Sequence, residues 1–346
     1  MRPLLVLAFL SLGGCYRAHE LPRPPDATRL SASWFHACHI TSRNELYCWG
    51  TNSFGELGDG LPLVTPRDVP FTHTPIHVDR EHAYREVSAG IGSTCAIRVD
   101  GTLLCWGRNF GGVLATGDRR DSSSPTRVGD ERDWQSVEVG AGFACGIHED
   151  ARMQCWGSPD DGGPGPYEEI PLPAAAALTT IPGRFRSVTS SWYRTFALEE
   201  NGTLYTSQND GTFVAIEGLG PIALVAGGVL AAFAVEESGR AIVLEPGDVD
   251  GALVPRVWAG PRVILADASY RLCMLTEAGE VLSTHASGSY AWDSGALSVV
   301  SSNAESIATG AGFACALDVE GVVTCWSEHG GVLYPIAPTV VSFPAD

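Results

Sequence analysis

The sequence of 346 residues carries 40 acidic and 22 basic side chains, a formal net charge of −18, and no lysine. This charge opposes binding to nucleic acid phosphates and to anionic lipid by bulk electrostatics, and the missing lysine excludes Schiff-base and P-loop chemistry. With 45% hydrophobic residues, 40 glycines and 22 prolines, the composition favours many short strands that are joined by turns.

The N-terminal residues have the organisation of a targeting segment. Arg2 supplies a positive charge, and residues 4–12 form an apolar run that is too short to span a bilayer. The run ends in Leu-Gly-Gly-Cys15, which resembles the lipobox of bacterial lipoproteins, and Tyr16 at the next position resembles lipoproteins that are sorted to the outer membrane. This resemblance implies a signal peptide over residues 1–14 and lipid attachment at Cys15; an ordinary secretory signal is the alternative.

A motif with two cysteine columns recurs through the rest of the chain. Its best copy reads C-A-I-R-V-D-G-T-L-L-C-W-G-R-N over residues 95–109, and seven copies follow one another at intervals of about 37 to 57 residues. The first column comprises Cys38, Cys95, Cys145, Phe196, Phe233, Cys273 and Cys315; the second comprises Cys48, Cys105, Cys155, Thr206, Val243, Ser283 and Cys325. Repeats of this length indicate units that bury their apolar faces against their neighbours.

Each copy predicts a β-hairpin. Cys95 and Ile97 lie on one face before the turn, and Leu103 and Cys105 lie on one face after it. The even spacing of the two columns implies a loop with an odd number of residues, which favours a three-residue turn that ends in a left-handed residue. Glycine or asparagine adopts that conformation at least cost. The predicted left-handed positions are Asn44, Gly101, Ala151, Gly202, Gly239, Gly279 and Gly321, of which only the alanine departs from the preference.

The paired cysteines predict four disulfides, because residues directly opposite each other in a hairpin lie within disulfide range. The expected pairs are Cys38–Cys48, Cys95–Cys105, Cys145–Cys155 and Cys315–Cys325, which leaves Cys273 opposite Ser283. Four disulfides indicate an oxidising compartment outside the cytoplasm. Zinc is the alternative, but the paired ligands of zinc sites lie only about two to four residues apart.

The best copies continue with W-G-x-N-x-x-G after the second column, over residues 49–58 and 106–114. This pattern resembles the regulator of chromosome condensation repeat, most specifically in the first three copies and the last. The resemblance implies an all-β, seven-bladed β-propeller over residues 28–346, behind a short tether over residues 15–27. The repeated tryptophans recur in register, which favours blade packing over ligand stacking: Trp49, Trp106, Trp156 and Trp326.

A P-x-x-V strand also recurs, at Pro66 to Val69 before the second copy and at Pro125 to Val128 before the third. The first copy has no clear equivalent upstream, whereas the chain ends in a similar strand over residues 338–343. We therefore expect this C-terminal strand to complete the first blade and close the ring, which would protect otherwise exposed sheet edges.

No motif compels an enzyme: G-x-S-x-G, H-E-x-x-H and a helix-opening G-x-G-x-x-G are missing. Three segments contain residues that could form a site, but we interpret them as loops and expect no metal and no cofactor. A histidine-rich segment could in principle gather a metal, and Asp248 to Gly251 resembles the start of a calcium loop but is followed by Ala252. The third is the glycine-rich stretch from Asp160 to Pro166. The histidine-rich segment contains His73, His77, Asp79, Glu81 and His82.

These features together predict a non-catalytic, lipid-anchored module of the cell envelope that binds another envelope or extracellular protein, reaches the bilayer through acylated Cys15 and is a monomer. A secreted inhibitor of a hydrolase such as a β-lactamase is one alternative, and a glycan-binding or enzymatic propeller is another. The nucleotide exchange known for the repeat family is not expected, because the predicted compartment holds no small nuclear GTPase.

Overall fold

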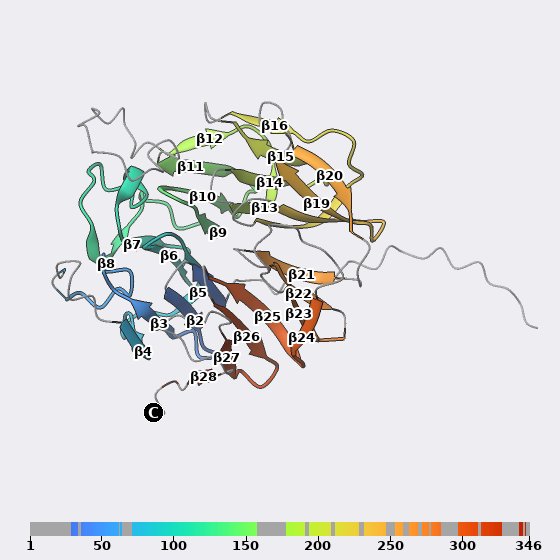
Figure 1. The fold of residues 1–346 in the computed structure, drawn as a ribbon. Coiled ribbons are helices and arrows are strands. Elements are labelled where there is room, and N and C mark those ends of the chain that lie inside the picture. Colours follow the sequence, from blue (N-terminus) through green and yellow to red (C-terminus); the bar gives the residue numbers. More distant parts are fainter. Residues whose placement is uncertain are drawn as a thin grey trace, which may run out of the picture.

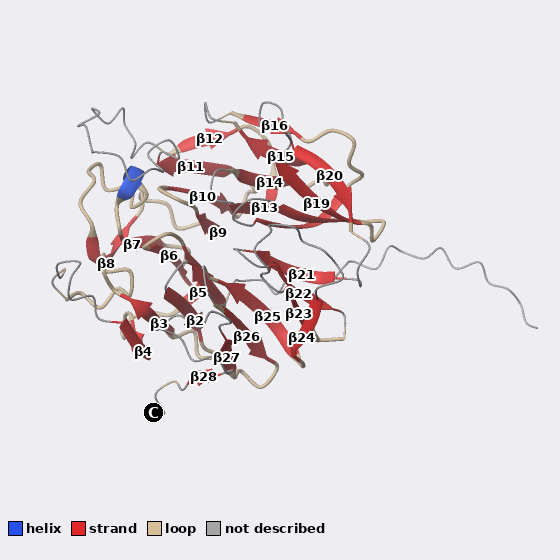
Figure 2. Cartoon of the chain, viewed as in Figure 1, coloured by secondary structure: helices blue, strands red, loops and turns tan. Residues whose placement is uncertain are grey.

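The computed structural model describes residues 29–33, 36–61, 63, 71–157, 178–190, 194–208, 212–227, 232–246, 253–258, 263–268, 272–276, 278–284, 297–310, 313–326, 339–341 and 343. These residues form seven four-stranded antiparallel sheets, one for each copy of the hairpin, and we number them 1 to 7 in chain order. In Figure 2 the regular elements of the described residues are strands, apart from one short 3-10 helix, η1 (Phe110–Gly112). No helix in this described part of the chain is long and apolar enough to cross a membrane.

The first three sheets contain β1 (Leu30–Ser33), β2 (His36–Ile40), β3 (Leu46–Thr51) and β4 (Phe71–His77); β5 (Tyr84–Ala89), β6 (Ser93–Arg98), β7 (Leu103–Gly107) and β8 (Ser122–Arg127); and β9 (Trp134–Val139), β10 (Phe143–His148), β11 (Met153–Gly157) and β12 (Thr179–Ile181). Sheets 4 and 5 contain β13 (Phe185–Ser190), β14 (Thr195–Glu199), β15 (Leu204–Ser207) and β16 (Phe213–Ala215); and β17 (Ile222–Gly227), β18 (Ala232–Glu236), β19 (Ala241–Pro246) and β20 (Leu253–Val257). Sheets 6 and 7 contain β21 (Val263–Ala268), β22 (Leu272–Thr276), β23 (Val281–Thr284) and β24 (Leu297–Ser301); and β25 (Ala304–Thr309), β26 (Ala314–Asp318), β27 (Val323–Trp326) and β28 (Thr339–Val341).

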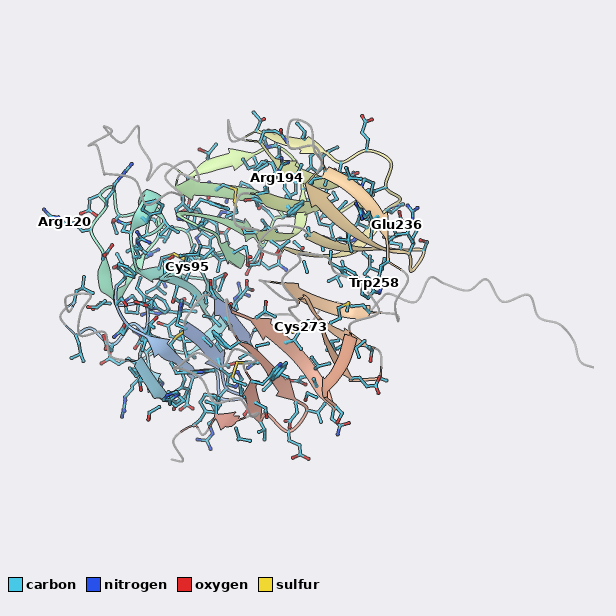
Figure 3. All side chains as sticks on the ribbon, in the orientation of Figure 1. Cys95, Arg120, Arg194, Glu236, Trp258 and Cys273 are labelled. Atoms are coloured by element: carbon cyan, nitrogen blue, oxygen red, sulfur yellow. A yellow bond between two sulfur atoms is a disulfide. The ribbon has the colours of Figure 1, made fainter. Side chains whose placement is uncertain are left out.

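The sheets follow one another around a common centre, from sheet 1 in blue to sheet 7 in red (Figure 1), and the first strand of each sheet contacts the first strand of the next, including β25 with β1. The fold is therefore an all-β propeller. Its core lies between neighbouring sheets: one cluster combines Cys95 and Ile97 of sheet 2 with Trp134 and Trp156 of sheet 3. Trp258, directly after β20 of sheet 5, and Cys273, in β22 of sheet 6, are buried, whereas the side chain of Arg120 is 91% exposed (Figure 3).

The predicted hairpins are confirmed in all seven copies. The two columns face each other directly, as Cys95 faces Cys105 and Phe233 faces Val243. All seven predicted turn positions adopt left-handed φ values between 65° and 87°, Ala151 included at 68°. The four predicted disulfides form, with Cα atoms 4.0 to 4.1 Å apart, and Cys273 lies buried opposite Ser283.

The predicted closure of the ring by the C-terminal strand is wrong. β28 pairs with β27 of its own sheet, and the fourth strand of sheet 1 is β4, which pairs with β3. Each sheet is consequently one continuous stretch of chain. The sequence prediction failed because Pro75 to Val78, rather than Pro66 to Val69, is the P-x-x-V segment of the first sheet; residues 66–69 lie outside the described part of the chain.

The P-x-x-V segment has a structural reason in the outer strands. The Val128 N–H donates to Leu103 O at 3.0 Å, and the Val78 N–H donates to Leu46 O at 3.0 Å. Because strand N–H groups alternate in direction, the nitrogen three residues earlier, in Pro125 or Pro75, points away from the sheet. Proline thus removes an outward donor, which blunts the exposed edge of the outer strand against pairing with another chain.

Side chains rather than a shared strand join sheet 7 to sheet 1. Leu30, Ala37 and Trp49 of sheet 1 share a cluster with Ala308 and Leu317 of sheet 7. Beyond β28, the ring of Phe343 has its centroid 5.0, 5.5 and 5.9 Å from the rings of three residues of sheet 1, which are His39, Tyr47 and Trp49. Phe343 therefore contributes to closure of the ring by aromatic packing.

We expect Phe343→Ala to lower the free energy of unfolding by about 1 to 2 kcal/mol, because it removes a partly buried ring from this junction. Thermal unfolding of the full chain measures the effect. Val340→Ala is the control, since Val340 is 59% exposed and should be nearly neutral. Equal midpoints for Phe343→Ala and the wild type would show that the ring closes without this contact.

Candidate functional site: the loop face

The two ends of the propeller carry different connections. Since the strands are antiparallel, the links from first to second and from third to fourth strand lie at one end, which we call the loop face. The hairpin turns and the links between sheets lie at the other end, the turn face. The loop face carries the W-G-x-N-x-x-G segments, whose described parts are residues 49–61 and 106–121.

Asparagine side chains fold two of these loops, and Asn109 is fully buried. The Asn52 Oδ1 accepts a hydrogen bond from the Leu57 N–H at 3.1 Å, and its Nδ2 donates to Asp59 Oδ2 at 2.7 Å. The Asn109 Oδ1 accepts from the Leu114 N–H at 3.0 Å, while its Nδ2 donates to the loop residues Thr116 and Asp118. Asparagine suits this position because one amide supplies both an acceptor and donors.

Two of the repeated tryptophans, Trp106 and Trp156, fix the loop of the preceding sheet. The Trp106 Nε1 donates to Glu56 O at 3.0 Å, and the Trp156 Nε1 donates to the equivalent Val113 O at 2.8 Å. Trp106 is fully buried. These bonds agree with the packing role predicted from the sequence and make the loop conformation depend on the next sheet.

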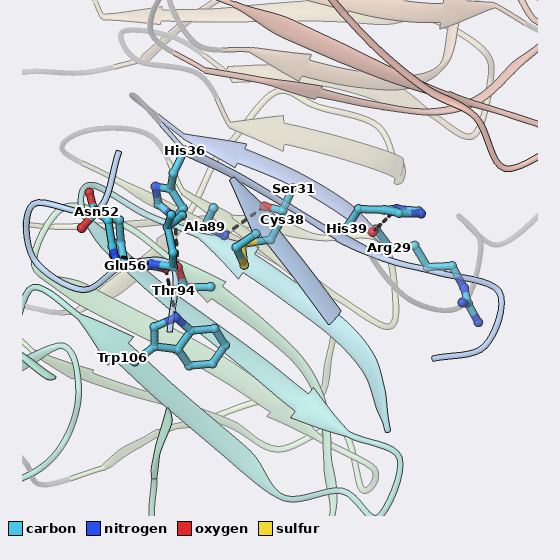
Figure 4. Close-up of a disulfide and its surroundings, with 12 residues drawn as sticks. Arg29, Ser31, His36, Cys38, His39, Asn52, Glu56, Ala89, Thr94 and Trp106 are labelled. Carbon is cyan, nitrogen blue, oxygen red and sulfur yellow. Dashed lines mark hydrogen bonds between the residues drawn. A yellow bond between two sulfur atoms is a disulfide. The ribbon is translucent and has the colours of Figure 1, made fainter. Parts of the chain in front are cut away.

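A buried histidine also helps to hold the first loop, residues 49–61, in place (Figure 4). Thr94 donates its hydroxyl proton to Glu56 O at 2.8 Å, and His36 Nε2 lies 2.9 Å from the same Thr94 hydroxyl. Since the hydroxyl proton is already used, His36 must donate through Nε2. Burial lowers the pKa of His36 to about 4, so this histidine is neutral in ordinary buffers and acts as a fixed donor.

An arginine lies between two phenylalanines on the loop face. The Arg108 guanidinium carbon is 4.9 Å from the ring centroid of Phe54 and 4.7 Å from that of Phe110, and all three side chains are half-buried. The Glu56 carboxylate holds the Phe54 loop by accepting from the Phe54 N–H at 2.7 Å, and burial raises the pKa of this carboxyl. Such stacks position the guanidinium edge and reduce its freedom. We call these three residues the arginine stack.

The first strands carry a feature that the sequence prediction missed. One side chain in each of four sheets, at the position opposite the first cysteine column, accepts a hydrogen bond from a backbone N–H of the next sheet. The four bonds run from Ala89 N to Ser31, from Val139 N to Ser88, from Ser190 N to Glu138 and from Gly227 N to Thr189, at 2.9 to 3.0 Å. Ala226 and Ala308 occupy this position in sheets 5 and 7 and have no side-chain acceptor. In the sequence these residues stand at a fixed distance before the first cysteine column, and that spacing could have predicted them.

The described residues of the histidine-rich segment do not converge on one point. His82 Nδ1 pairs with Asp79 Oδ2 at 2.9 Å, whereas His77 stacks on Tyr47 with ring centroids 4.6 Å apart. Within the described ranges, no three histidine, cysteine or acidic side chains are placed to hold a metal ion. Cys15, residues 160–166 and residues 248–252 lie outside those ranges.

The architecture defines a β-propeller protein that is built from one repeated four-stranded unit. Residues 27–56 and 84–112 match one model of the regulator of chromosome condensation (RCC1) repeat, and residues 100–147 match a second model of that repeat. The chain therefore contains RCC1 repeats, as the W-G-x-N-x-x-G pattern predicted.

Relatives among curated proteins share only part of this chain. The ultraviolet-B receptor UVR8 of Arabidopsis thaliana is 30% identical over 115 residues, which are 31% of this chain and 24% of the receptor. A bifunctional serine/threonine-protein kinase/NEDD4-like E3 ubiquitin-protein ligase of Dictyostelium discoideum is 30% identical over 91 residues, which are 26% of this chain and 5% of that protein. The match thus spans far less than two thirds of either relative.

Solved structures match over most of the chain. Prp20p of Saccharomyces cerevisiae superimposes with a TM-score of 0.69 at 17% identity, covering 91% of this chain and 87% of that chain. Human WBSCR16 superimposes with a TM-score of 0.69 at 15% identity, covering 87% and 95%. At these identities the likeness establishes the fold.

Proposed function

We propose that this chain is a non-catalytic, lipid-anchored protein-binding module of the cell envelope that contacts its partner through the loop face. In this proposal the seven sheets act as the seven blades of one closed ring, and acylated Cys15 attaches it to the membrane. The four disulfides support an oxidising compartment. The net charge of −18 opposes a nucleic acid partner.

Proteins with the same fold support binding to other proteins. The Prp20p structure is described with its binding to Gsp1p and histones, and yeast RCC1 has been solved bound to Kap60. Those partners belong to those proteins. What we carry over is the general use of a propeller of this type as a rigid platform for a protein partner.

The arginine stack is the observation that carries the proposal. Arginine and aromatic side chains dominate the energetically important positions of protein interfaces. Phe54, Arg108 and Phe110 lie on loops that Asn52, Asn109 and Trp106 hold in place without a partner. A preorganised loop loses little conformational entropy on binding, so its contacts contribute more fully to affinity.

Arg108→Ala is expected to weaken partner binding by about 30-fold, the effect of losing a central interface residue worth roughly 2 kcal/mol. The partner is first captured from the native envelope by brief cross-linking, and its affinity is then measured with purified proteins. Arg132→Ala is the matched control, because Arg132 lies on the turn face, where it pairs with Asp100 at 2.9 Å.

Unchanged affinity of Arg108→Ala would reject the loop face as the binding surface. Mass spectrometry of the captured chain tests the anchor separately: a diacylglyceryl adduct on Cys15 supports it, whereas an unmodified Cys15 rejects the lipid anchor without affecting the binding result.

A further inference from the structure

Glu86 is a buried carboxyl at the junction of sheets 2 and 3, remote in sequence from the loop-face residues. It lies on β5 and is only 4% exposed. Its Oε1 accepts a hydrogen bond from the Val137 N–H of β9 at 2.8 Å. A buried carboxyl that spans two sheets must either keep its proton or carry an expensive buried charge.

A second set of hydrogen bonds runs beside this one, from the junction of sheets 2 and 3 to sheet 4. The Val139 N–H donates to Ser88 Oγ at 3.0 Å, and Ser88 Oγ donates to Glu138 Oε2 at 3.3 Å. The other oxygen of Glu138 accepts from the Ser190 N–H at 3.0 Å. Two carboxyl groups and one hydroxyl therefore join the first strands β5, β9 and β13.

The charges around Glu86 are unbalanced. Arg85 on the same strand favours the ionised form, but its described hydrogen bond goes to Trp134 O; Glu138 on β9 opposes ionisation. Burial has the largest effect and raises the pKa of Glu86 to about 8, although the hydrogen bond from the Val137 N–H favours the ionised form.

The other strands packed on β5 carry polar and titratable side chains that are hydrogen-bonded or ion-paired elsewhere. β6 places Ala96 and Ile97 opposite Val87 and Glu86. Its titratable Arg98 pairs with Asp79, at the end of the strand opposite Tyr84. β2 carries His36, bonded to Thr94, and His39, bonded to Arg29 O, while the Ser31 hydroxyl of β1 accepts from the Ala89 N–H. The described bonds of these groups thus run to partners other than the Glu86 carboxyl.

We propose that Glu86 keeps its proton in the folded protein and that loss of this proton to water loosens the junction of sheets 2 and 3, which makes this side of the ring a proton-dependent lock. In the neutral form the carboxyl accepts from Val137 without a net charge. In the ionised form it carries a buried charge that the charge of Glu138 opposes. Since the folded pKa lies above the unfolded value, the contribution is present below about pH 4.5 and is lost as the pH rises through about 8.

The test compares thermal unfolding of the full chain from pH 5 to pH 9 in the wild type and in Glu86→Gln, which keeps an acceptor for Val137. The wild-type midpoint should fall over this range while the Glu86→Gln midpoint falls much less. Glu320→Gln, on an exposed residue of the turn face, should keep the wild-type slope. Parallel slopes for the wild type and Glu86→Gln would overturn the proposal.

Hydrogen exchange provides the local readout. Protection of the Val137, Val139 and Ser190 amides, corrected for base catalysis, should drop by up to about tenfold per pH unit between about pH 5 and about pH 8 in the wild type and level off above that, whereas it should stay constant in Glu86→Gln. If Glu86→Gln does not fold, infrared titration of the wild-type chain decides: a protonated-carboxyl band that disappears near pH 8 supports the lock, and no such band at pH 6 overturns it.

Discussion

Reduction of the four disulfides should lower the unfolding midpoint by on the order of 20 °C. Each bridge closes a short hairpin loop and contributes roughly 2.5 to 3 kcal/mol in the chain-entropy model. Four such terms amount to about 10 kcal/mol, which is comparable to the whole stability of many domains. The measurement is thermal unfolding of the native chain with and without a thiol reductant under non-denaturing conditions.

Cys273→Ser is the control that distinguishes reduction of the disulfides from an effect of the reductant on the free thiol. Cys273 is outside the four disulfides and lies opposite Ser283, so the variant should show the full reductant-dependent shift. Removing one bridge, as Cys95→Ala with Cys105→Ala, should reproduce about a quarter of it. A reduced protein with an unchanged midpoint would mean that sheet packing alone holds the ring.

Gly101→Ala should destabilise the protein by about 3 to 4 kcal/mol, far more than the same change at Gly239. Both glycines hold the left-handed turn position, with φ of 80° and 84°, so both variants incur about 1 kcal/mol of backbone strain. A Cβ on Gly101 would lie 1.9 Å from Arg132 O, whereas a Cβ on Gly239 meets nothing within 4 Å. The excess comes from displacing the backbone that links sheets 2 and 3.

Chemical denaturation of the two variants measures the difference directly. Ala151→Gly should instead stabilise the protein by up to about 1 kcal/mol. Ala151 already adopts φ of 68°, and glycine removes the backbone strain of a side chain in that conformation. Equal destabilisation by Gly101→Ala and Gly239→Ala would show that the turn itself, and not its contact with the next sheet, sets the cost.

The two proposals concern different parts of the ring. The arginine stack lies on the loop face between sheets 1 and 2, whereas the carboxyl lock lies on the first strands of sheets 2 to 4. Loosening of sheet 2 would act on the stack through Trp106, whose indole holds the first loop. Partner affinity of the wild type should therefore weaken at alkaline pH if both proposals hold.

The sequence by itself determined the local unit. The hairpin, its register, its left-handed turn and the cysteine pairs all depend on residues within one copy, so the alternation around Gly101 and the spacing of Cys95 and Cys105 were sufficient to predict them. The tryptophan packing followed from the same periodicity.

Only the tertiary structure decided how the units meet. The partner of the last strand, the stack of Arg108 between Phe54 and Phe110, and the bond from Val137 to Glu86 all join segments from different strands, loops or sheets. Hydrophobic periodicity specifies which face of a strand is buried but not which distant segment covers it. Those pairings depend on how the sheets are arranged around the ring. The candidate site depends on them as well.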